Sequence, residues 1–300
     1  MARSRVGVVG TGYWAKAIHA PTLAVHPEAD FVGVYGRDPA KGAAIAAANG
    51  VRAFASFDEM LAEVDIVSIA VPPTVQCDYA LPAARAGKHL LLEKPLSIDS
   101  ASALELADAA DEHSVSSVVF FTGRYLPEWE SWLDQAIASQ PLCARGEWFV
   151  ALVGPAEVYV SPWRTDYGAL WDLGAHMLSF ILPALGPVKS VAGLRGSGDL
   201  VHLILSHEAG GSSTISVSET LPVEADRLTA DLCTTSGWTS RPKGGLSTAD
   251  SQRAYGNALS ELISNMTSGE RRHRCDVHFG RAVVDVLVRC EEQLADSRST

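Results

Sequence analysis

The chain has few cysteines, and none of them stands in a metal-binding or disulfide pattern. The five, at positions 77, 143, 233, 275 and 290, are odd in number and include no C-x-x-C pair. This spacing argues against a zinc site and a disulfide framework, and it is typical of a reducing compartment. Because the histidines also lack metal-ligand spacing, we predict no metal site.

Positive charge and long apolar runs are also scarce. The 24 lysines and arginines are outnumbered by 35 aspartates and glutamates, which gives a net charge of −11. Nucleic-acid binders hold phosphates with a surplus of Lys and Arg, so a nucleic-acid partner is disfavoured. No apolar run approaches the length needed to cross a bilayer, and a core strand that begins near Arg5 leaves no room for a secretory signal. We predict a cytoplasmic protein with no membrane partner.

The first part of the chain instead shows a regular alternation of strands and helices. Its strand-like runs are apolar throughout, as in a parallel sheet that is covered on both faces. Together with 300 residues, which favours two domains, this pattern predicts an α/β fold with a doubly wound Rossmann domain over residues 1–123. The expected strands are 6–9, 31–35, 66–71, 90–92 and 117–121, and the expected helices are 14–25, 40–49, 79–86 and 100–113.

After Arg124 the strand-like segments become longer and alternate apolar with polar residues. Such segments, at 144–152, 201–207 and 212–219, predict antiparallel strands with one face buried and one face open. Helices are expected over 171–185 and 277–295, and a mobile loop over 241–250, which is rich in Gly, Ser and Thr. We therefore predict that residues 124–300 form an α+β domain for substrate binding and oligomerisation.

A glycine-rich loop follows the first strand, with the sequence Gly10-Thr11-Gly12-Tyr13-Trp14-Ala15. Gly10 permits the tight turn, Gly12 removes the side chain that would block a pyrophosphate, and Ala15 lets the helix approach the sheet. Such a loop alone can be a plain structural turn. The strand before it, the helix after it and the later strand–helix repeats favour dinucleotide binding instead.

The end of the second strand bears on the choice of cofactor. An acidic residue there would normally hold the ribose 2′-hydroxyl, but this chain has Gly36-Arg37-Asp38. Gly36 leaves space for a 2′-phosphate, and the Arg37 guanidinium can pair with it, which favours NADP, with NAD as second choice. The alternative is a solvated Arg37 in a turn, with Asp38 on the ribose.

The segment Glu93-Lys94-Pro95 ends a predicted strand. Ligands of open α/β sheets bind at the carboxyl ends of the strands, where the Lys94 ammonium can polarise a carbonyl or stabilise an alkoxide. Pro95 fixes the direction of the chain, and a cis bond is compatible with such a turn. The alternative is an ordinary surface Glu–Lys pair.

A second candidate site lies on the helix expected over 171–185. Asp172 and His176 are four residues apart and share one helix face, and Gly174 between them permits close approach. Imidazole titrates near neutrality and suits proton transfer beside a hydride transfer. The alternative is an Asp that favours the helix dipole and an unrelated His.

These motifs together resemble the Gfo/Idh/MocA family, named after glucose–fructose oxidoreductase and inositol dehydrogenase. The markers occur in order over most of the first 190 residues: Gly10 to Trp14, Val71-Pro72-Pro73, Ala86-Gly87-Lys88-His89 running into Glu93-Lys94-Pro95, Trp163-Arg164, and Asp172-x-Gly-x-His176. The resemblance implies that Lys94, Asp172 and His176 form the catalytic set. It also implies a second half with a mostly antiparallel open sheet, whose outer face commonly makes subunit contacts.

Three features depart from the family pattern. Gln76 stands where the family often has His, which weakens one expected contact near the nicotinamide, and Ser179 stands where a further Asp is frequent. The chain is also short for the family and has no diagnostic motif after Val191. The departures concern the identity of the substrate more than the chemistry.

From these observations we predict an oxidoreductase that transfers a hydride between NADP and a sugar, polyol or sugar-derived ketone. His176 would accept or return the hydroxyl proton, Asp172 would orient the imidazole or bind a neighbouring hydroxyl, and Lys94 would hold the reacting oxygen. The residues expected to bind the cofactor are Gly10, Thr11, Gly12, Tyr13, Trp14, Ala15, Arg37, Pro72, Glu93 and Lys94.

Substrate binding is expected of Arg124, Trp163 and Arg164 together with Asp172 and His176. A core role for the aromatic residues and surface ion pairing for the arginines are the alternatives. The expected partners are a small polyhydroxylated substrate and further copies of the chain, in a dimer or tetramer. Two other functions compete: reduction of a non-sugar ketone or an imine, and an NADP(H)-binding sensor or scaffold without turnover. The intact set of Lys94, Asp172 and His176 argues against the sensor.

Overall fold

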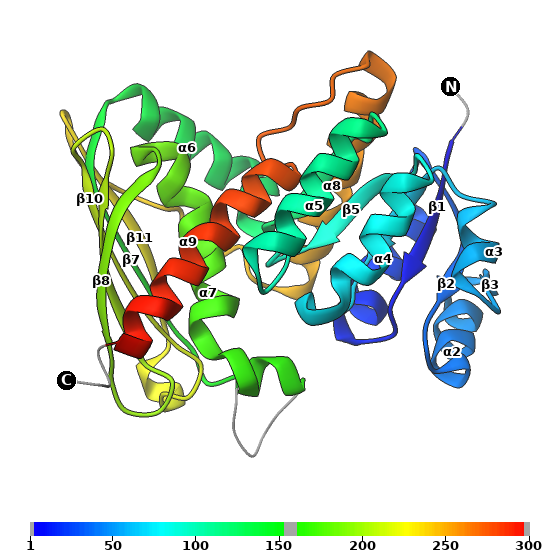
Figure 1. The fold of residues 1–300 in the computed structure, drawn as a ribbon, viewed down its shortest axis with the longest axis horizontal. Coiled ribbons are helices and arrows are strands. Elements are labelled where there is room, and N and C mark those ends of the chain that lie inside the picture. Colours follow the sequence, from blue (N-terminus) through cyan, green and yellow to red (C-terminus); the bar gives the residue numbers. More distant parts are fainter. Residues whose placement is uncertain (1–2, 153–160, 297–300) are drawn as a thin grey trace. The chain divides into compact units, whose positions relative to one another are not determined.

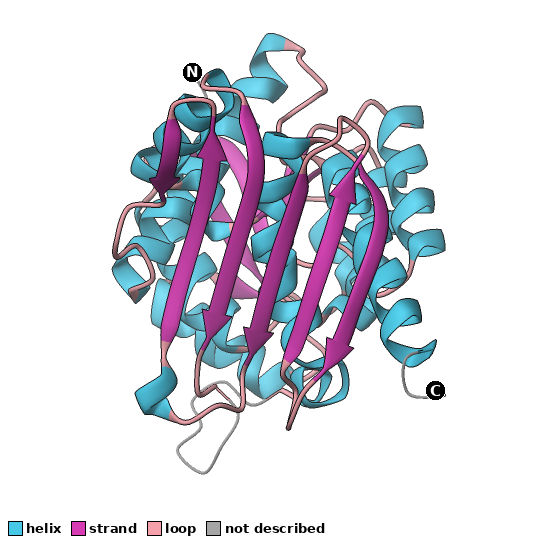
Figure 2. Ribbon diagram, turned by 90° about the vertical axis from the view of Figure 1, so that its left-hand side faces the viewer, coloured by secondary structure: helices cyan, strands magenta, loops and turns pink. Residues whose placement is uncertain are grey.

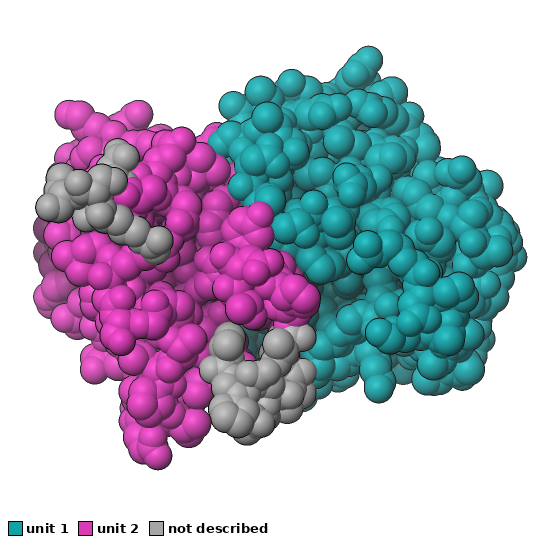
Figure 3. Space-filling view, turned by 60° about the horizontal axis from the view of Figure 1, so that its bottom comes forward, with its two compact units in different colours: residues 1–126, 244–281 teal, residues 127–243, 282–300 magenta. Residues whose placement is uncertain are grey.

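The protein is described by a computed structural model that covers residues 3–152 and 161–296. The chain forms two compact units, which Figure 3 shows in different colours. Unit 1 comprises Met1–Leu126 and Gly244–Arg281, and unit 2 comprises Pro127–Lys243 and Ala282–Thr300. The sequence prediction divided the chain once, between residues 123 and 124, whereas residues 244–281 return to the first unit.

Unit 1 contains a six-stranded sheet in the order β3-β2-β1-β4-β5-β6, and all its pairings are parallel. The strand order reverses between β1 and β4. Because strand–helix–strand connections are right-handed, the helices that lead away from this point in opposite directions cover opposite faces. The predicted Rossmann fold is confirmed. The strands are β1 (Ser4–Val9), β2 (Ala29–Tyr35), β3 (Arg52–Ala53), β4 (Ile66–Ile69), β5 (His89–Glu93) and β6 (Ser117–Phe120).

The helices of unit 1 differ from the prediction at three places. The first begins with a π-helical turn, η1, before it continues as α1. Helix α4 starts at Pro73, six residues before the expected Tyr79, because proline is well suited to the first position of a helix. The helices are η1 (Ala15–His19), α1 (Ala20–Val25), α2 (Pro39–Asn49), α3 (Phe57–Leu61), α4 (Pro73–Arg85), α5 (Ser100–Glu112) and the 3₁₀ turn η2 (Thr122–Tyr125).

The third difference is helix α8 (Thr248–Ser268), which the sequence analysis missed. It begins inside the segment expected as a mobile loop. Ser247 and Asp250 form a capping box, a start signal that the composition of the loop obscured. Helix α8 packs on η1, α1, η2 and β6 and thereby becomes part of unit 1. The last helix, α9 (Val277–Asp296), begins in unit 1 and continues in unit 2.

Unit 2 contains a second six-stranded sheet, in the order β12-β11-β7-β10-β9-β8. The pair β10–β7 is parallel and the other four pairs are antiparallel, so the predicted mostly antiparallel sheet is confirmed. Its elements are α6 (Pro127–Ala138), β7 (Pro141–Phe149), α7 (Pro162–Leu185), β8 (Val188–Arg195), β9 (Val201–His207), β10 (Ser212–Ser218), the 3₁₀ turn η3 (Val223–Ala225), β11 (Arg227–Thr234) and β12 (Gly237–Ser240).

The two faces of this second sheet differ. The inner face packs on α7 through side chains such as Leu203 and Ile215, which are almost fully buried. The outer face, which is turned toward the viewer in Figure 2, is open among the described residues. It carries Ile204 and Trp238, each 60% exposed, and Leu194, 58% exposed. A sheet face with exposed large apolar residues is suited to a protein contact.

Helix α7 is interrupted at Gly168, whose φ of 66° is outside the helical region. The expected helix over 171–185 corresponds to the part after this kink. The sequence analysis found no run that could cross a bilayer, yet α7 has the required length and a mean hydropathy of 1.3 over its most apolar window. That window is 78% buried, as expected of a core helix.

Candidate active site

The glycine-rich loop of unit 1 has the conformation that a dinucleotide-binding turn requires. Gly10 has a φ of 126°, and a Cβ at this position would lie 2.2 Å from the Ala70 carbonyl oxygen, so only glycine fits. A Cβ at Gly12 would point into open space, with no atom within 4 Å. The loop therefore keeps free the volume that a pyrophosphate would occupy.

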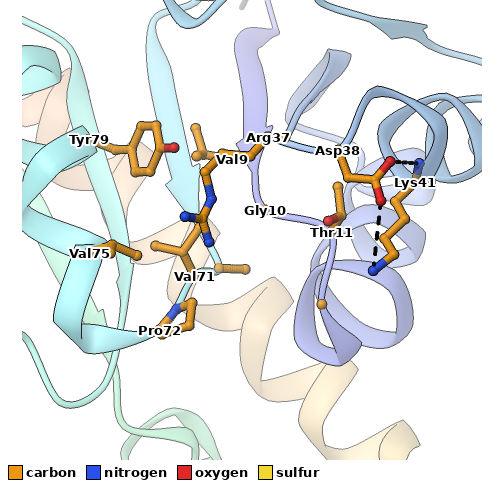
Figure 4. Close-up of a pocket in the computed structure, with 13 residues that line it drawn as sticks. Val9, Gly10, Thr11, Arg37, Asp38, Lys41, Val71, Pro72, Val75 and Tyr79 are labelled. Carbon is orange, nitrogen blue, oxygen red and sulfur yellow. Dashed lines mark hydrogen bonds and ion pairs between the residues drawn. The ribbon is translucent and has the colours of Figure 1, made fainter. Parts of the chain in front are cut away.

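A pocket of about 230 Å³ opens beside this loop. Figure 4 shows that its walls come from the loop, from the turn between β2 and α2, and from the start of α4. Its lining residues are Val9, Gly10, Thr11, Gly12, Gly36, Arg37, Asp38, Lys41, Ala70, Val71, Pro72, Val75 and Tyr79. Two cationic side chains and a cradle of glycines give a site that fits the anionic pyrophosphate and the adjoining adenosine of a nicotinamide dinucleotide.

Arg37 and Asp38 point in different directions at the rim of this pocket (Figure 4). Asp38 is the N-cap of α2: its Oδ1 accepts hydrogen bonds from the backbone N–H groups of Ala40 (3.0 Å) and Lys41 (3.2 Å). Its Oδ2 lies 3.8 Å from the Lys41 ammonium. Arg37 extends toward Val71, away from this cap. One carboxylate oxygen is thus occupied by the helix cap, while the guanidinium lines the pocket.

Lys94 follows β5 directly, and its peptide bond to Pro95 is cis. Lys94 is only 6% exposed, which contradicts the alternative of a surface Glu–Lys pair. Gln76 of α4 holds the backbone here: its Oε1 accepts from the Glu93 N–H (2.9 Å), and its Nε2 donates to the carbonyls of Glu93 (2.7 Å) and Leu96 (3.1 Å). Gln76, expected to be a weakened nicotinamide contact, is fully buried and fixes the segment that carries Lys94.

Asp172 and His176 lie on one face of α7 in unit 2, and both are buried. Asp172 Oδ2 accepts a hydrogen bond of 2.6 Å from Arg164 Nε, so this arginine is ion-paired inside the unit. The His176 ring lies against Trp148 of β7, with ring centroids 5.3 Å apart. A Cβ at Gly174 would lie 3.6 Å from Leu287 of α9, an ordinary van der Waals distance, so the packing here does not require the close approach that the sequence suggested. The carboxylate and the imidazole are therefore held in a packed environment.

The other predicted substrate residues of the second half, Trp163 and Arg164, contact each other in unit 2. Trp163 is buried, and the Arg164 guanidinium lies 4.9 Å from the centre of its ring. Ser179 is fully buried and donates a hydrogen bond of 2.7 Å to the His176 carbonyl. The serine that departs from the family pattern thus contacts the backbone of the helix.

The remaining predicted residues lie in unit 1. Ala15 is fully buried at the start of η1, as close approach to the sheet requires. Tyr13 and Trp14 make edge-on ring contacts with each other, and the Tyr13 hydroxyl lies 3.5 Å from Thr248 of α8. Pro72 caps α4 and lines the pocket. Arg124 is buried beside the Phe279 ring, with its carbonyl bonded to Arg274.

Sequence reasoning missed several residues around these sites. Lys41 and Tyr79 line the pocket, and the fully buried His19 contacts Glu93. The helix expected over 40–49 already placed Lys41 in its first turn, beside the Arg37 end of the second strand, but not in the pocket. Burial and the neighbouring Tyr35 raise the pKa of Tyr79, and Arg37 opposes this, so the phenol stays protonated next to the guanidinium. No local signal in the sequence marks His19, because its partners come from distant segments.

Two kinds of comparison connect these sites to known proteins. Residues 4–121 match the Gfo/Idh/MocA oxidoreductase family, NAD-binding Rossmann fold. An uncharacterized oxidoreductase of Synechocystis sp. is 32% identical over 196 residues, which cover 62% of this chain and 53% of that protein. UDP-N-acetylglucosamine 3-dehydrogenase of Acidithiobacillus ferrooxidans is 28% identical over 234 residues, 76% of this chain and 71% of that protein. The match thus spans about half the length of the first of these relatives.

Solved structures share the fold over almost the whole chain. GenD2 from gentamicin A biosynthesis, in complex with NAD, has a TM-score of 0.85 at 23% identity and covers 99% of this chain and 95% of its own. Levoglucosan dehydrogenase, in complex with NADH and L-sorbose, has a TM-score of 0.84 at 16% identity, with coverages of 99% and 98%. The matched segment, its glycine loop and the shared fold agree: residues 4–121 form a Rossmann domain of the Gfo/Idh/MocA oxidoreductase family.

Proposed function

We propose that this protein is an NADP-dependent oxidoreductase that transfers a hydride to or from a carbinol carbon of a sugar, a polyol or a sugar-derived ketone. The observation that carries the proposal is the pocket beside the glycine loop, where Gly10 and Gly12 leave room for a pyrophosphate and Arg37 supplies a cation. A bound nicotinamide dinucleotide supplies the hydride chemistry, and the protein supplies orientation and proton transfer.

The preference for NADP over NAD is supported by the different contacts of Arg37, which lines the pocket, and Asp38, which caps α2. An NAD site needs a carboxylate on the ribose hydroxyls, but Asp38 Oδ1 accepts two backbone hydrogen bonds from α2. Arg37 and Lys41 both line the pocket and can bind a 2′-phosphate. A hydrogen bond to a charged group contributes about 1.5–3 kcal/mol, which favours NADP by roughly ten- to a hundredfold.

The acid–base chemistry is proposed for Lys94, Asp172 and His176. Lys94 holds the reacting oxygen and stabilises its negative charge, and His176 accepts the hydroxyl proton during oxidation and returns it during reduction. Asp172 accepts a hydrogen bond from Arg164, which fixes the carboxylate for contact with the imidazole or with a neighbouring substrate hydroxyl. Such assistance typically accelerates a reaction by about 10²–10⁴-fold.

The sugar class is supported by the relatives and neighbours. Two relatives are a UDP-N-acetylglucosamine 3-dehydrogenase and, from Bacillus subtilis, a glucose-6-phosphate 3-dehydrogenase, 31% identical over 122 residues that cover 41% of this chain and 35% of that protein. Both names describe oxidation of a ring hydroxyl.

A cytoplasmic location remains our proposal, supported by five free cysteines among the described residues.

We also propose a homo-oligomer in which a second copy covers the outer face of the unit 2 sheet. Leu194, Ile204 and Trp238 expose their apolar side chains on this face, which favours burial against another surface. The same face of a second copy offers a matching surface, as a two-fold contact requires.

The experiment is a two-step assay. Binding of NADPH and of NADH is first measured by cofactor fluorescence, and oxidation of each is then followed at 340 nm with a panel of ketosugars, non-sugar ketones and imines. We expect tighter binding of NADPH and turnover with a sugar-class substrate. Turnover only with non-sugar ketones or imines would contradict the substrate class, and binding without any turnover would identify a sensor.

A further inference from the structure

We propose that His19 is a positioning residue for Lys94, acting through Glu93, and that it joins the helix after the glycine loop to the catalytic lysine. This inference rests on the proposed role of Lys94. Its basis is a row of hydrogen-bonded, buried polar side chains that connects α8 and η1 to β4 and β5. All of these side chains lie in unit 1, and none belongs to the predicted catalytic set.

The chain of contacts runs through four side chains. The Tyr255 hydroxyl of α8 lies 2.7 Å from Ser68 Oγ of β4, and this oxygen lies 2.9 Å from His19 Nδ1. His19 Nε2 lies 3.0 Å from Glu93 Oε1, and Glu93 Oε2 accepts from the Lys94 backbone N–H at 3.3 Å. His19, Ser68 and Tyr255 are fully buried, and Glu93 is 7% exposed. Removing one member would leave a buried polar group without its hydrogen-bond partner, which is energetically unfavourable.

The direction of the hydrogen bonds follows from the chemistry of the two ends. Burial raises the pKa of Tyr255, so its hydroxyl keeps a proton that it can donate to Ser68. Ser68 can then donate to His19 Nδ1, which leaves the Nε2 proton of His19 for the Glu93 carboxylate. In this arrangement each of Tyr255, Ser68 and His19 donates one hydrogen bond to the next group toward Glu93. The imidazole therefore fixes which way the carboxylate is turned, and the second carboxylate oxygen holds the Lys94 backbone.

The π-helical turn at Ala15–His19 is the local feature that accompanies the inward position of His19. Ala20 N–H donates to the Ala15 carbonyl, five residues earlier, so this turn contains one more residue than an α-helical turn. Such turns are rare and occur frequently at functional sites. Without the extra residue, the side chains of η1 would be rotated relative to α1, and the imidazole would leave Ser68 and Glu93.

The segment of Lys94 is thus held from two elements. His19 of η1 holds the Glu93 side chain, while Gln76 of α4 bonds the backbone of Glu93 and Leu96. These contacts bracket Lys94 on both sides along the chain. A displacement of about 1 Å of a catalytic group can cost roughly a hundredfold in rate, so the bracket matters for turnover even though His19 itself does not touch the reacting atoms.

A purely structural role is the competing explanation, because removing any buried hydrogen bond lowers stability. The two roles differ in their effect on Lys94. The chain has six lysines, so protein labelled with ¹³Cε-lysine gives few signals, and the signal of Lys94 is assigned by its loss in Lys94→Ala. This measurement needs neither cofactor nor substrate.

The test compares three variants. His19→Asn keeps a polar atom near Nδ1 for Ser68 but loses the Glu93 contact, while His19→Gln can place its amide near Nε2 and restore that contact. His207→Asn is the matched control: His207 is buried in unit 2 and likewise has both ring nitrogens bonded, to the Gly186 carbonyl (2.8 Å) and to Ser213 Oγ (2.9 Å). The control loses a comparable contact but is not connected to Lys94.

We expect His19→Asn to shift or broaden the Lys94 signal and to lower kcat by about ten- to a hundredfold, with the Kd for NADPH changed less than about threefold. His19→Gln should recover most of kcat, and His207→Asn should lower Tm without changing the Lys94 signal or kcat. In the Lys94→Ala background, His19→Asn should cause little further loss, because both changes act on one unit.

Several results would overturn the inference: an unchanged Lys94 signal in folded His19→Asn, an equal loss of kcat in His207→Asn, or losses that multiply in the double variant. If His19→Asn does not fold, Glu93→Gln replaces it, because this isosteric change removes one of the two carboxylate acceptors and should move the same signal. Full activity of Lys94→Ala would refute the proposed catalytic role itself. If Lys94→Ala loses activity while His19→Asn keeps the wild-type activity and Lys94 signal, only the positioning role of His19 would be refuted.

Discussion

The two six-stranded sheets of this chain support function in opposite ways. The parallel sheet of unit 1 is covered by helices, and its ligand pocket lies at the ends of its strands, beside the loop after β1. The mixed sheet of unit 2 has one open face, and its candidate residues are on α7, which packs on the other face. In unit 1 backbone geometry at Gly10 and Gly12 shapes the site, whereas in unit 2 the candidate chemistry rests on buried side chains. Motifs built on backbone geometry are easier to recognise in a sequence.

The largest expected effect concerns the catalytic residues of both units. Lys94→Ala and His176→Ala should each lower kcat/KM for the sugar-class substrate by about 10²–10⁴-fold, because each removes charge or proton transfer in the transition state. The measurement is steady-state kinetics with NADPH at saturation. Lys189→Ala, which removes an exposed lysine of unit 2, serves as control and should leave kcat/KM unchanged. A large loss for Lys94 alone would assign the chemistry to unit 1 only.

A smaller effect is expected at the pocket of unit 1. Arg37→Ala should lower the ratio of kcat/KM for NADPH to that for NADH by about ten- to a hundredfold, since the 2′-phosphate loses its guanidinium partner. Arg85→Ala, an exposed arginine of α4 that is ion-paired with Glu105, is the matched control. An unchanged ratio in Arg37→Ala would remove the proposed preference for NADP.

The open face of unit 2 predicts a change in assembly. Ile204→Lys should convert the oligomer into monomers or smaller assemblies, because it places a charge in the middle of an apolar contact. Mass is measured by size-exclusion chromatography with light scattering. Val25→Lys changes an apolar residue of unit 1 that is 81% exposed and should leave the mass unaltered. Should both variants behave alike, the open face is not the contact.

The smallest expected effect is on the pH dependence of stability. Burial lowers the pKa of His89 in β5, so the folded protein disfavours its protonated form. Its stabilising contribution is therefore complete above the unfolded pKa of about 6.5 and decreases as the pH falls below that value toward the folded pKa. His89→Gln should flatten the decrease of the unfolding free energy between about pH 6.5 and 5, measured by urea denaturation. His202→Gln, on the exposed face of the second sheet, should not flatten it.

How far the sequence predicted the molecule depended on whether the determining contacts are local. The Rossmann strands, the glycine loop and the turn at Lys94 follow from short motifs, and the structure confirms the fold they indicate. Helix α8 was missed because its Gly- and Ser-rich approach resembles a loop and its capping box is a single short signal. The role of Gln76 and the surroundings of His19 could not be predicted, because their partners are far away in the sequence.

The return of residues 244–281 to unit 1 also concerns how the chain is made. During synthesis the N-terminal segment of unit 1 leaves the ribosome before residues 127–243 of unit 2 and before Tyr255. The Ser68 hydroxyl therefore lacks its Tyr255 partner until the second segment of unit 1 is made. Contacts between such distant segments slow folding. A shortened gene that stops at residue 126 would therefore yield an N-terminal half whose buried polar chain lacks one end, and chaperone dependence of this intermediate is the expected cost.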